Sequence, residues 1–188
     1  QLYQVLVLGL KDYAHKNGFK DVILGMSGGI DSAFCAALAV DAFGPENVST
    51  YMMPSPFTSK DSFEDAEACA NALGASYEVL SIETVMHTYD GIIGHHLQND
   101  KTGLGHENLQ SRARGLMLMT LSNIYGGMVL ATGNKSEYAV GYATLYGDMC
   151  GGYAPIKDVY KTTVFKLAKW RNENVFDGAL GPSGEVIP

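Results

Sequence analysis

The sequence predicts an α/β fold: an open, mostly parallel sheet with helices on both faces. Short apolar runs typical of buried strands alternate with longer runs at helical spacing. The spacing between successive strands leaves room for a crossover helix, as in βαβ units. With 188 residues, 46% of them hydrophobic, the chain fits one domain with a substantial core.

The first part of the chain begins with a helical pattern. Apolar residues recur at helical spacing from Leu2 to Tyr13, and Asn17-Gly18 supplies a C-terminal stop. Prolines and glycines then separate the runs that follow. The expected elements are a strand at 22–26, a helix at 31–43, a strand at 48–53, a helix at 59–73 and a strand at 77–80.

The second part continues the alternation but contains two irregular segments. Residues 98–107 are polar and predict an exposed loop, and residues 141–155 are rich in glycine and show no periodicity. We interpret both segments as hypothetical lids. The remaining expected elements are helices at 82–97, 108–125 and 161–171 and a strand at 128–131.

A glycine-rich turn, Ser27-Gly28-Gly29-Ile30-Asp31-Ser32, stands between a predicted strand and a predicted helix. Backbone N–H groups and a helix N-terminus at such a place favour an anion, so the turn predicts a phosphate site. The turn lacks the Gly-Lys-Ser/Thr of a Walker A loop. Its positive charge must therefore come from Mg²⁺ and from lysines elsewhere.

Polar turns at 27–32, 55–60 and 132–137 each follow a predicted strand. Ligands of open α/β sheets bind at the carboxyl ends of strands, so Asp31 and Glu137 are expected to converge on one cleft. Oxygen ligands from separate elements, completed by phosphates and water, suit Mg²⁺. The alternatives are that Asp31 caps a helix, which is compatible with a metal role, and that Glu137 is a solvated side chain.

Composition and charge exclude several classes of protein. A net charge of −7 without a basic stripe argues against a general nucleic-acid binder. No run approaches the roughly 20 apolar residues of a membrane span. The three cysteines lack Cys-x-x-Cys spacing, which indicates neither a disulfide framework nor a zinc ribbon and favours a reducing, cytoplasmic setting. We expect Cys35 and Cys69 to be buried.

The glycine-rich turn resembles the loop of the PP-loop ATP pyrophosphatase superfamily, which has the adenine nucleotide alpha-hydrolase-like fold. Further motifs follow in order at residues 107–114, 132–137, 141–148 and 155–162. Together they resemble the NAD⁺ synthetases over roughly residues 20 to 175. This resemblance implies ATP-dependent amidation of deamido-NAD⁺ through an acyl-adenylate, with release of AMP and pyrophosphate.

The resemblance also implies roles for residues at matching positions. Asp31 and Glu137 would hold Mg²⁺, and together with Lys161 they are the candidate catalytic residues. Without the family match, Lys161 is a solvated lysine at a helix start. The ATP-binding candidates are Gly25, Met26, Ser27, Gly28, Gly29, Ile30, Asp31, Ser32, Thr132 and Lys161. The deamido-NAD⁺ candidates are Asn108, Arg112, Glu137 and Asp148.

Two departures indicate the longer, glutamine-dependent branch of the family. Leu145 stands where ammonia-dependent enzymes commonly have lysine, and Gly151-Gly152 stands where they carry an acid. The expected domain, residues 1–188, is then the synthetase fragment of a longer chain whose glutaminase domain is absent. Both ends of the chain, at Gln1 and Pro188, look like cuts. In this family the helix at 108–125 helps to form a homodimer.

Two other functions remain open from the residues. One is another PP-loop amidating ligase, such as a GMP synthetase-like enzyme. The other is a non-catalytic module that binds an adenine nucleotide. His95, His96 and His106 lack the spacing of a zinc site and are interpreted as surface histidines.

Overall fold

The computed structural model describes residues 1–100 and 102–188. Four strands form one parallel sheet in the order β3-β2-β1-β4. The strands are β1 (Val22–Gly25), β2 (Val48–Met52), β3 (Ser76–Val79) and β4 (Met128–Leu130). This arrangement confirms the predicted fold class.

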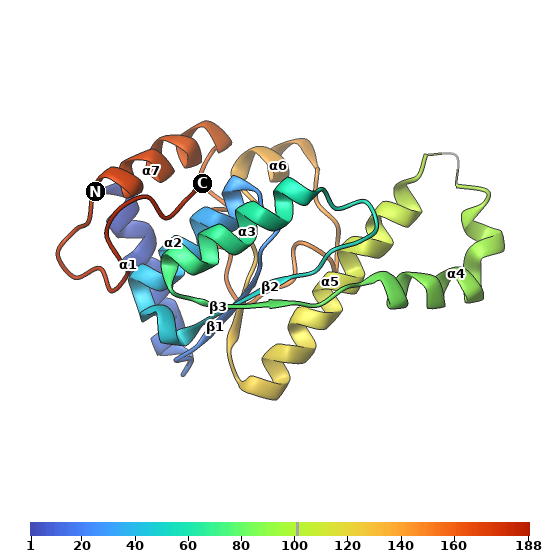
Figure 1. Cartoon of the computed structure of the whole chain (residues 1–188), viewed down its shortest axis with the longest axis horizontal. Helices are drawn as coiled ribbons and strands as arrows, with labels where there is room; N and C mark the ends of the chain where they lie inside the picture. Colours follow the sequence, from blue (N-terminus) through green and yellow to red (C-terminus); the bar gives the residue numbers. More distant parts are fainter. Residues whose placement is uncertain (101) are drawn as a thin grey trace.

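Helices follow the strands as the sequence predicts (Figure 1), except that an unexpected short helix, Lys135–Val140, takes up part of the predicted polar turn at 132–137. A short 3₁₀ turn, Pro45–Asn47, precedes β2. The helices are α1 (Leu2–Lys16), α2 (Ile30–Phe43), α3 (Lys60–Leu73), α4 (Glu83–Leu97), α5 (Leu104–Tyr125), α6 (Lys135–Val140) and α7 (Lys161–Glu173).

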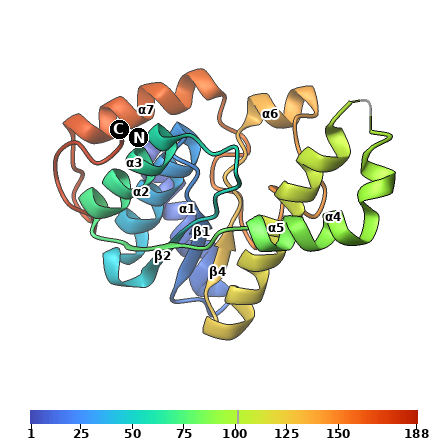
Figure 2. The ribbon, with the colours of Figure 1, turned by 45° about the vertical axis from the view of Figure 1, so that its right-hand side comes forward.

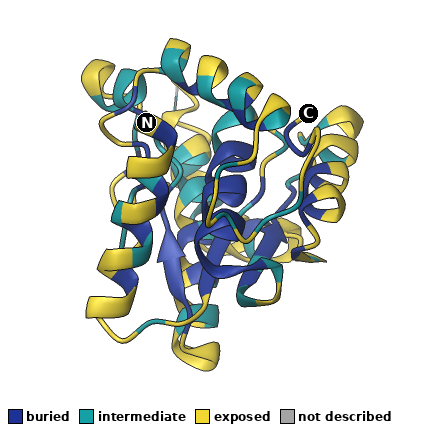
Figure 3. Ribbon diagram, turned by 90° about the vertical axis from the view of Figure 1, so that its left-hand side faces the viewer, coloured by how far each residue is buried: buried dark blue, intermediate teal, exposed yellow. Residues whose placement is uncertain are grey.

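The two faces of the sheet are buried in separate apolar clusters. Side chains alternate along a strand, so Val22 and Leu24 of β1 join the cluster under α1, α2, α3 and α7. Ile23 lies on the opposite face, in a cluster with Ala113 and Leu118 of α5. Figure 3 shows the buried inner strands in dark blue and the outer sides of the helices in yellow, whereas the edge strand β3 is largely exposed.

The strand order places a topological switch at β1. From β1 the chain proceeds to β2 and β3 on one side, and it later returns to place β4 on the other side. Open α/β sheets bind ligands in the crevice outside such a point. The turn after β1 and the turn after β4 are therefore neighbours, which positions the candidate site.

The expected loop at 98–107 is wrong over its last four residues, because α5 already begins at Leu104. The polar composition of residues 98–107 gives no indication that a helix begins at Leu104. Asp100 accepts hydrogen bonds from the backbone N–H groups of Thr102 and Gly105, at 3.2 and 2.6 Å, and these bonds organise the turn before α5. Residue 101 of the expected loop lies outside the described residues.

Figures 1 and 2 both show α4 and the start of α5 extending away from the sheet. The irregular segment at 141–155 ends against β4. Ala131 N donates to the Tyr153 carbonyl oxygen at 2.9 Å. A Cβ at Gly151 would lie only 2.9 Å from the Val129 carbonyl oxygen, so this close approach requires glycine.

Cys35 and Cys69 are both buried, as predicted. Burial raises the pKa of both thiols, and that of Cys69 reaches about 12. No helix in the described part of the chain is long and apolar enough to cross a membrane.

Candidate active site

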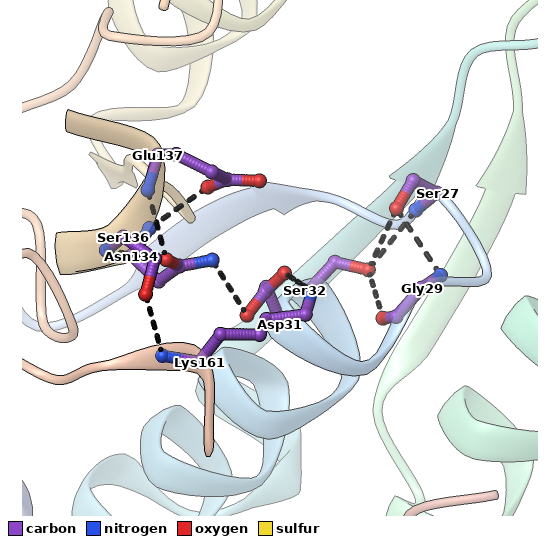
Figure 4. Close-up of polar contacts among 8 residues, drawn as sticks. All are labelled: Ser27, Gly29, Asp31, Ser32, Asn134, Ser136, Glu137 and Lys161. Atoms are coloured by element: carbon purple, nitrogen blue, oxygen red, sulfur yellow. Dashed lines mark hydrogen bonds and ion pairs between the residues drawn. The ribbon is translucent and has the colours of Figure 1, made fainter. Parts of the chain in front are cut away.

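The turn after β1 is held in shape by its own serine side chains (Figure 4). Ser32 Oγ accepts a hydrogen bond from Ser27 N at 3.2 Å and donates one to the Gly29 carbonyl oxygen at 2.9 Å. Ser27 Oγ accepts from Gly29 N at 3.2 Å. The turn leads directly into α2, whose N-terminus carries partial positive charge. The geometry is that of an anion cradle.

Gly28 fixes the other side of this cradle. Its φ of +80° lies in the left-handed region, and a Cβ there would come within 2.6 Å of Ser62 Cα in the first turn of α3. Both the backbone conformation and the close approach require glycine. The cradle therefore packs closely against the backbone of α3.

Asn134 connects Asp31 with Glu137 and is itself fully buried. Its Oδ1 accepts from the N–H groups of Ser136 and Glu137 at 2.8 and 3.1 Å. Glu137 Oε2 accepts from Asn134 N at 2.9 Å, which completes a capping box at the start of α6. The Asn134 amide Nδ2 also donates to Asp31 Oδ1 at 3.3 Å.

Lys161, the first residue of α7, lies beside Asp31 and the start of α6. Its ammonium forms an ion pair with Asp31 Oδ2, and its backbone N donates to Ser136 Oγ at 3.1 Å. The turn after β1, the turn after β4 and the start of α7 thus meet (Figure 4). Asp31 contacts Lys161 and Asn134 and does not cap α2, whose N-cap residue is Gly29. Glu137 is a capping-box residue and not merely a solvated side chain.

Two cavities open at this junction. The smaller, of about 140 Å³, is lined by both Asp31 and Glu137. The larger, of about 560 Å³, extends over the ends of β1, β2 and β4 beside α5, and its lining includes Gly25 and Met26. The two share the lining residues Ser27, Thr132, Tyr142, Ala143 and Asp148. Gly28, Gly29 and Ile30 line neither of these two cavities.

Asn108 and Asp148 lie together at the larger cavity, whereas Arg112 does not join them. Asn108 Oδ1 accepts from Thr144 Oγ1 at 2.8 Å, and Asp148 Oδ1 accepts from Thr144 N at 2.8 Å. Arg112 lines neither cavity. Its Nε donates to the Leu145 carbonyl oxygen at 3.2 Å, so it holds the 141–155 segment against α5.

Two residues of the site were not among the sequence candidates. Arg114 lines the larger cavity, and its Nε donates to the Met53 carbonyl oxygen at 2.9 Å. Burial lowers the pKa of this guanidinium. Asn134 was the other omission, although the Asn-x-x-Glu spacing with Glu137 signals a capping box. Nothing in the spacing of the arginines distinguishes Arg114 from Arg112.

The donor set fits a hard divalent cation. Asp31 and Glu137 offer carboxylate oxygens to one cavity, and the Lys161 ammonium already occupies a cation position beside Asp31. Within residues 1–100 and 102–188, no three His, Cys, Asp or Glu side chains are grouped to hold a metal ion alone. A Mg²⁺ ion here would need phosphate and water oxygens to complete its shell.

Known proteins resemble this chain in sequence and in architecture. The family model described as NAD synthase matches residues 2–181. The glutamine-dependent NAD(+) synthetase of Rhodobacter capsulatus is 50% identical over 188 residues, which are 100% of this chain and 34% of that protein. That of Xanthomonas campestris is 55% identical over 170 residues, 90% of this chain and 31% of that protein. The chain spans about a third of the length of these curated relatives.

Solved structures agree with the sequence relatives. The glutamine-dependent NAD⁺ synthetase of Acinetobacter baumannii, in complex with ADP, superposes with a TM-score of 0.93 at 48% identity, covering 100% of this chain and 34% of that one. The NMN synthetase of Francisella tularensis gives a TM-score of 0.81 at 28% identity, covering 90% of this chain and 68% of that one. The family match extends over nearly all of the chain and includes the cradle, both carboxylates and Lys161. The chain belongs to the NAD synthase family.

Proposed function

We propose that this site carries out the ATP-dependent amidation of deamido-NAD⁺ to NAD⁺. The observation that carries the proposal is the junction of a phosphate cradle, Asp31, Glu137 and Lys161 with a cavity of about 560 Å³. The cradle suits the pyrophosphate of ATP, and the large cavity has room for further parts of two nucleotide substrates. Membership of the NAD synthase family supports this choice of substrates.

In the first step the nicotinate carboxylate of deamido-NAD⁺ attacks the α-phosphorus of ATP. A P–O bond to the acyl oxygen forms, the α–β bridge bond breaks, and pyrophosphate leaves. The difficulty is electrostatic, because an anion approaches a polyanion. Lys161 and the N–H groups of the cradle would stabilise the leaving pyrophosphate, and this matters most as its charge develops.

In the second step ammonia attacks the acyl carbon and expels AMP, losing a proton as the amide forms. The acyl-adenylate must be kept from water until ammonia arrives. The 141–155 segment contributes Tyr142, Thr144 and Asp148 to the lining of the larger cavity. We assign to this segment the role of a lid, and to Asn108 and Asp148 contacts with the dinucleotide.

Mg²⁺ is part of the proposal. Asp31 and Glu137 would hold the ion, and Lys161 would turn from Asp31 toward the phosphates when it binds. The bound ion would offset phosphate charge and polarise the phosphoryl oxygens.

The proposal also includes partners. Because the chain spans about a third of its curated relatives, we propose that it acts as the synthetase domain of a longer cytoplasmic chain, with ammonia delivered by a glutaminase domain. We further propose a homodimer through the outer side of α5, where Leu116, Ile124 and Tyr125 are exposed. Exposed apolar side chains gathered on one helix are typical of such interfaces.

The test is a comparison of substrates on the full-length natural protein. AMP release is measured with ATP and ammonium plus deamido-NAD⁺, nicotinate mononucleotide or xanthosine monophosphate. The proposal requires deamido-NAD⁺ to give the highest kcat/KM. The likeness to an NMN synthetase makes the mononucleotide the second candidate, and a preference for it or for the xanthosine nucleotide would reject the proposed substrate. ATP binding without AMP release would indicate a non-catalytic module.

A further inference from the structure

Two ion pairs join the same two helices. Asp31, in the first turn of α2, pairs with Lys161, the first residue of α7. Asp41, near the end of α2, pairs with Arg171, near the end of α7. Each acid meets the basic residue 130 positions later in the chain. The helices are therefore tied together at both ends.

The two pairs differ in their access to solvent. The Asp41 and Arg171 side chains are 0% exposed, whereas the Lys161 side chain is 39% exposed and that of Asp31 14%. A ligand entering the smaller cavity reaches Asp31, and the ion pair places the Lys161 ammonium next to that carboxylate, although Lys161 itself lines neither cavity. The buried pair, Asp41 with Arg171, lines neither cavity and is out of the reach of such a ligand.

The buried pair has a geometry that fixes orientation. Arg171 Nε and Nη2 donate to the two oxygens of Asp41 at 2.6 and 2.8 Å, and Tyr3 Oη donates to Asp41 Oδ2 at 2.7 Å. Arg171 Nη2 also donates to the Pro182 carbonyl oxygen at 2.7 Å. Burial alone would lower the pKa of Arg171, but the hydrogen bonds and charge of Asp41 outweigh it and raise that pKa.

Stability alone is a poor explanation for this pair. Well-packed apolar side chains often replace a buried ion pair without loss of stability, because desolvating two charges is expensive. Arg171 Nη1 is in addition buried without a hydrogen-bond partner among the described residues. An apolar contact would allow α7 to slide or rotate, whereas a bidentate guanidinium–carboxylate contact holds one orientation.

We propose that Asp41 and Arg171 are positioning residues, which fix α7 against α2 so that the Lys161 ammonium enters the phosphate site at one depth. The inference rests on the proposed function of Lys161. A slip of α7 by one turn, about 5.4 Å, would break the contact of Lys161 N with Ser136 Oγ. It would also withdraw the ammonium from Asp31.

The test replaces the buried pair with apolar side chains of similar volume. In the full-length natural protein, Asp41→Leu/Arg171→Met is compared with wild type, Lys161→Ala and the triple variant. We expect the pair variant to fold with a moderately lower unfolding temperature, because the buried Tyr3 hydroxyl and the Pro182 carbonyl lose their partners. We also expect it to lose about tenfold or more in kcat and to keep the KM for deamido-NAD⁺. Adding the pair changes to Lys161→Ala should lower kcat no further, since residues acting as a unit are not additive.

A purely structural role predicts the opposite outcomes. A folded pair variant with wild-type kcat would overturn the inference, and so would losses that multiply in the triple variant. If the pair variant does not fold, Arg171→Lys takes its place in the same comparison, because lysine keeps the charge but loses the bidentate contact. Leu73→Ala is the control for lost stability, since Leu73 is fully buried at the end of α3. It should lower the unfolding temperature and leave kcat near wild type.

The same experiment separates this inference from the proposed function. A wild-type protein that forms no NAD⁺, or a fully active Lys161→Ala, rejects the function of the site. An active wild type, an impaired Lys161→Ala and an unimpaired pair variant reject only the positioning role.

Discussion

The side-chain amide of Asn134 donates to the carboxylate of Asp31, at 3.3 Å, across 103 residues of sequence. The same side chain caps α6 and accepts from Glu137 N. One buried residue thus sets the separation of the two carboxylates proposed to hold Mg²⁺.

Asn134→Asp tests this connection. An aspartate keeps the acceptor that caps α6 but loses the amide donor and places a second negative charge beside Asp31. We expect lower thermal stability, because the added charge is fully buried beside the Asp31 carboxylate, and a loss of activity that added Mg²⁺ partly restores. Asn134→Ala is the matched variant, because it also removes the cap and should destabilise the protein by about 1 kcal/mol. Equal activity of wild type and Asn134→Asp would show that the amide contact has no role.

Glycine at position 28 is expected to be essential to the cradle. Gly28→Ala adds a Cβ that overlaps the α3 backbone and also forces a left-handed alanine. Gly18→Ala has the same φ of +80° with nothing within 4 Å of its Cβ, so it carries the conformational strain alone, about 1–2 kcal/mol. Chemical denaturation should show a larger loss for Gly28→Ala, and calorimetry should show that only this variant loses ATP affinity. Equal losses in the two variants would contradict the packing argument.

The carboxylates should determine the metal dependence. We expect Asp31→Asn to lower kcat by about 100-fold and Glu137→Gln to raise the Mg²⁺ concentration needed for half-maximal activity. Asp31→Asn removes a charge that faces both Lys161 and the proposed metal position. Glu137→Gln has the milder effect, because a glutamine at this position can still complete the capping box of α6. A Mg²⁺ titration of steady-state rates checks both. An unchanged Mg²⁺ requirement in both variants would remove these residues from the metal site.

Buried thiols should make stability fall at alkaline pH. The pKa of Cys69 rises from its usual 9.0 to about 12 through burial, so the folded protein holds a proton that the unfolded chain releases. The stabilisation is complete below pH 9 and is lost as the pH rises toward 12, by at most about 1.4 kcal/mol per pH unit. Denaturant unfolding between pH 8 and pH 11 measures the slope, which should be smaller in Cys69→Ala. An equal slope would contradict the assignment.

Much of the fold follows from the sequence because its causes are local. Apolar periodicity and glycine or proline boundaries locate the strands and helices, and the βαβ order then brings Asp31 and Glu137 to one edge of the sheet. The start of α5 was missed because Asp100 organises the preceding turn through contacts that polar composition does not reveal. The pairing of Asp41 with Arg171 depends on two helices distant in sequence, and no periodicity within either helix signals it.

The central claim is that this site activates a carboxylate by adenylation, and isotope exchange tests it most directly. Labelled pyrophosphate is incubated with the full-length natural protein, ATP, Mg²⁺ and deamido-NAD⁺, without any nitrogen donor. The account predicts that label enters ATP only when deamido-NAD⁺ is present, and that Asp31→Asn slows the exchange about 100-fold. Absence of exchange in an enzyme that forms NAD⁺ once ammonia is added, or exchange at the wild-type rate in Asp31→Asn, would contradict it.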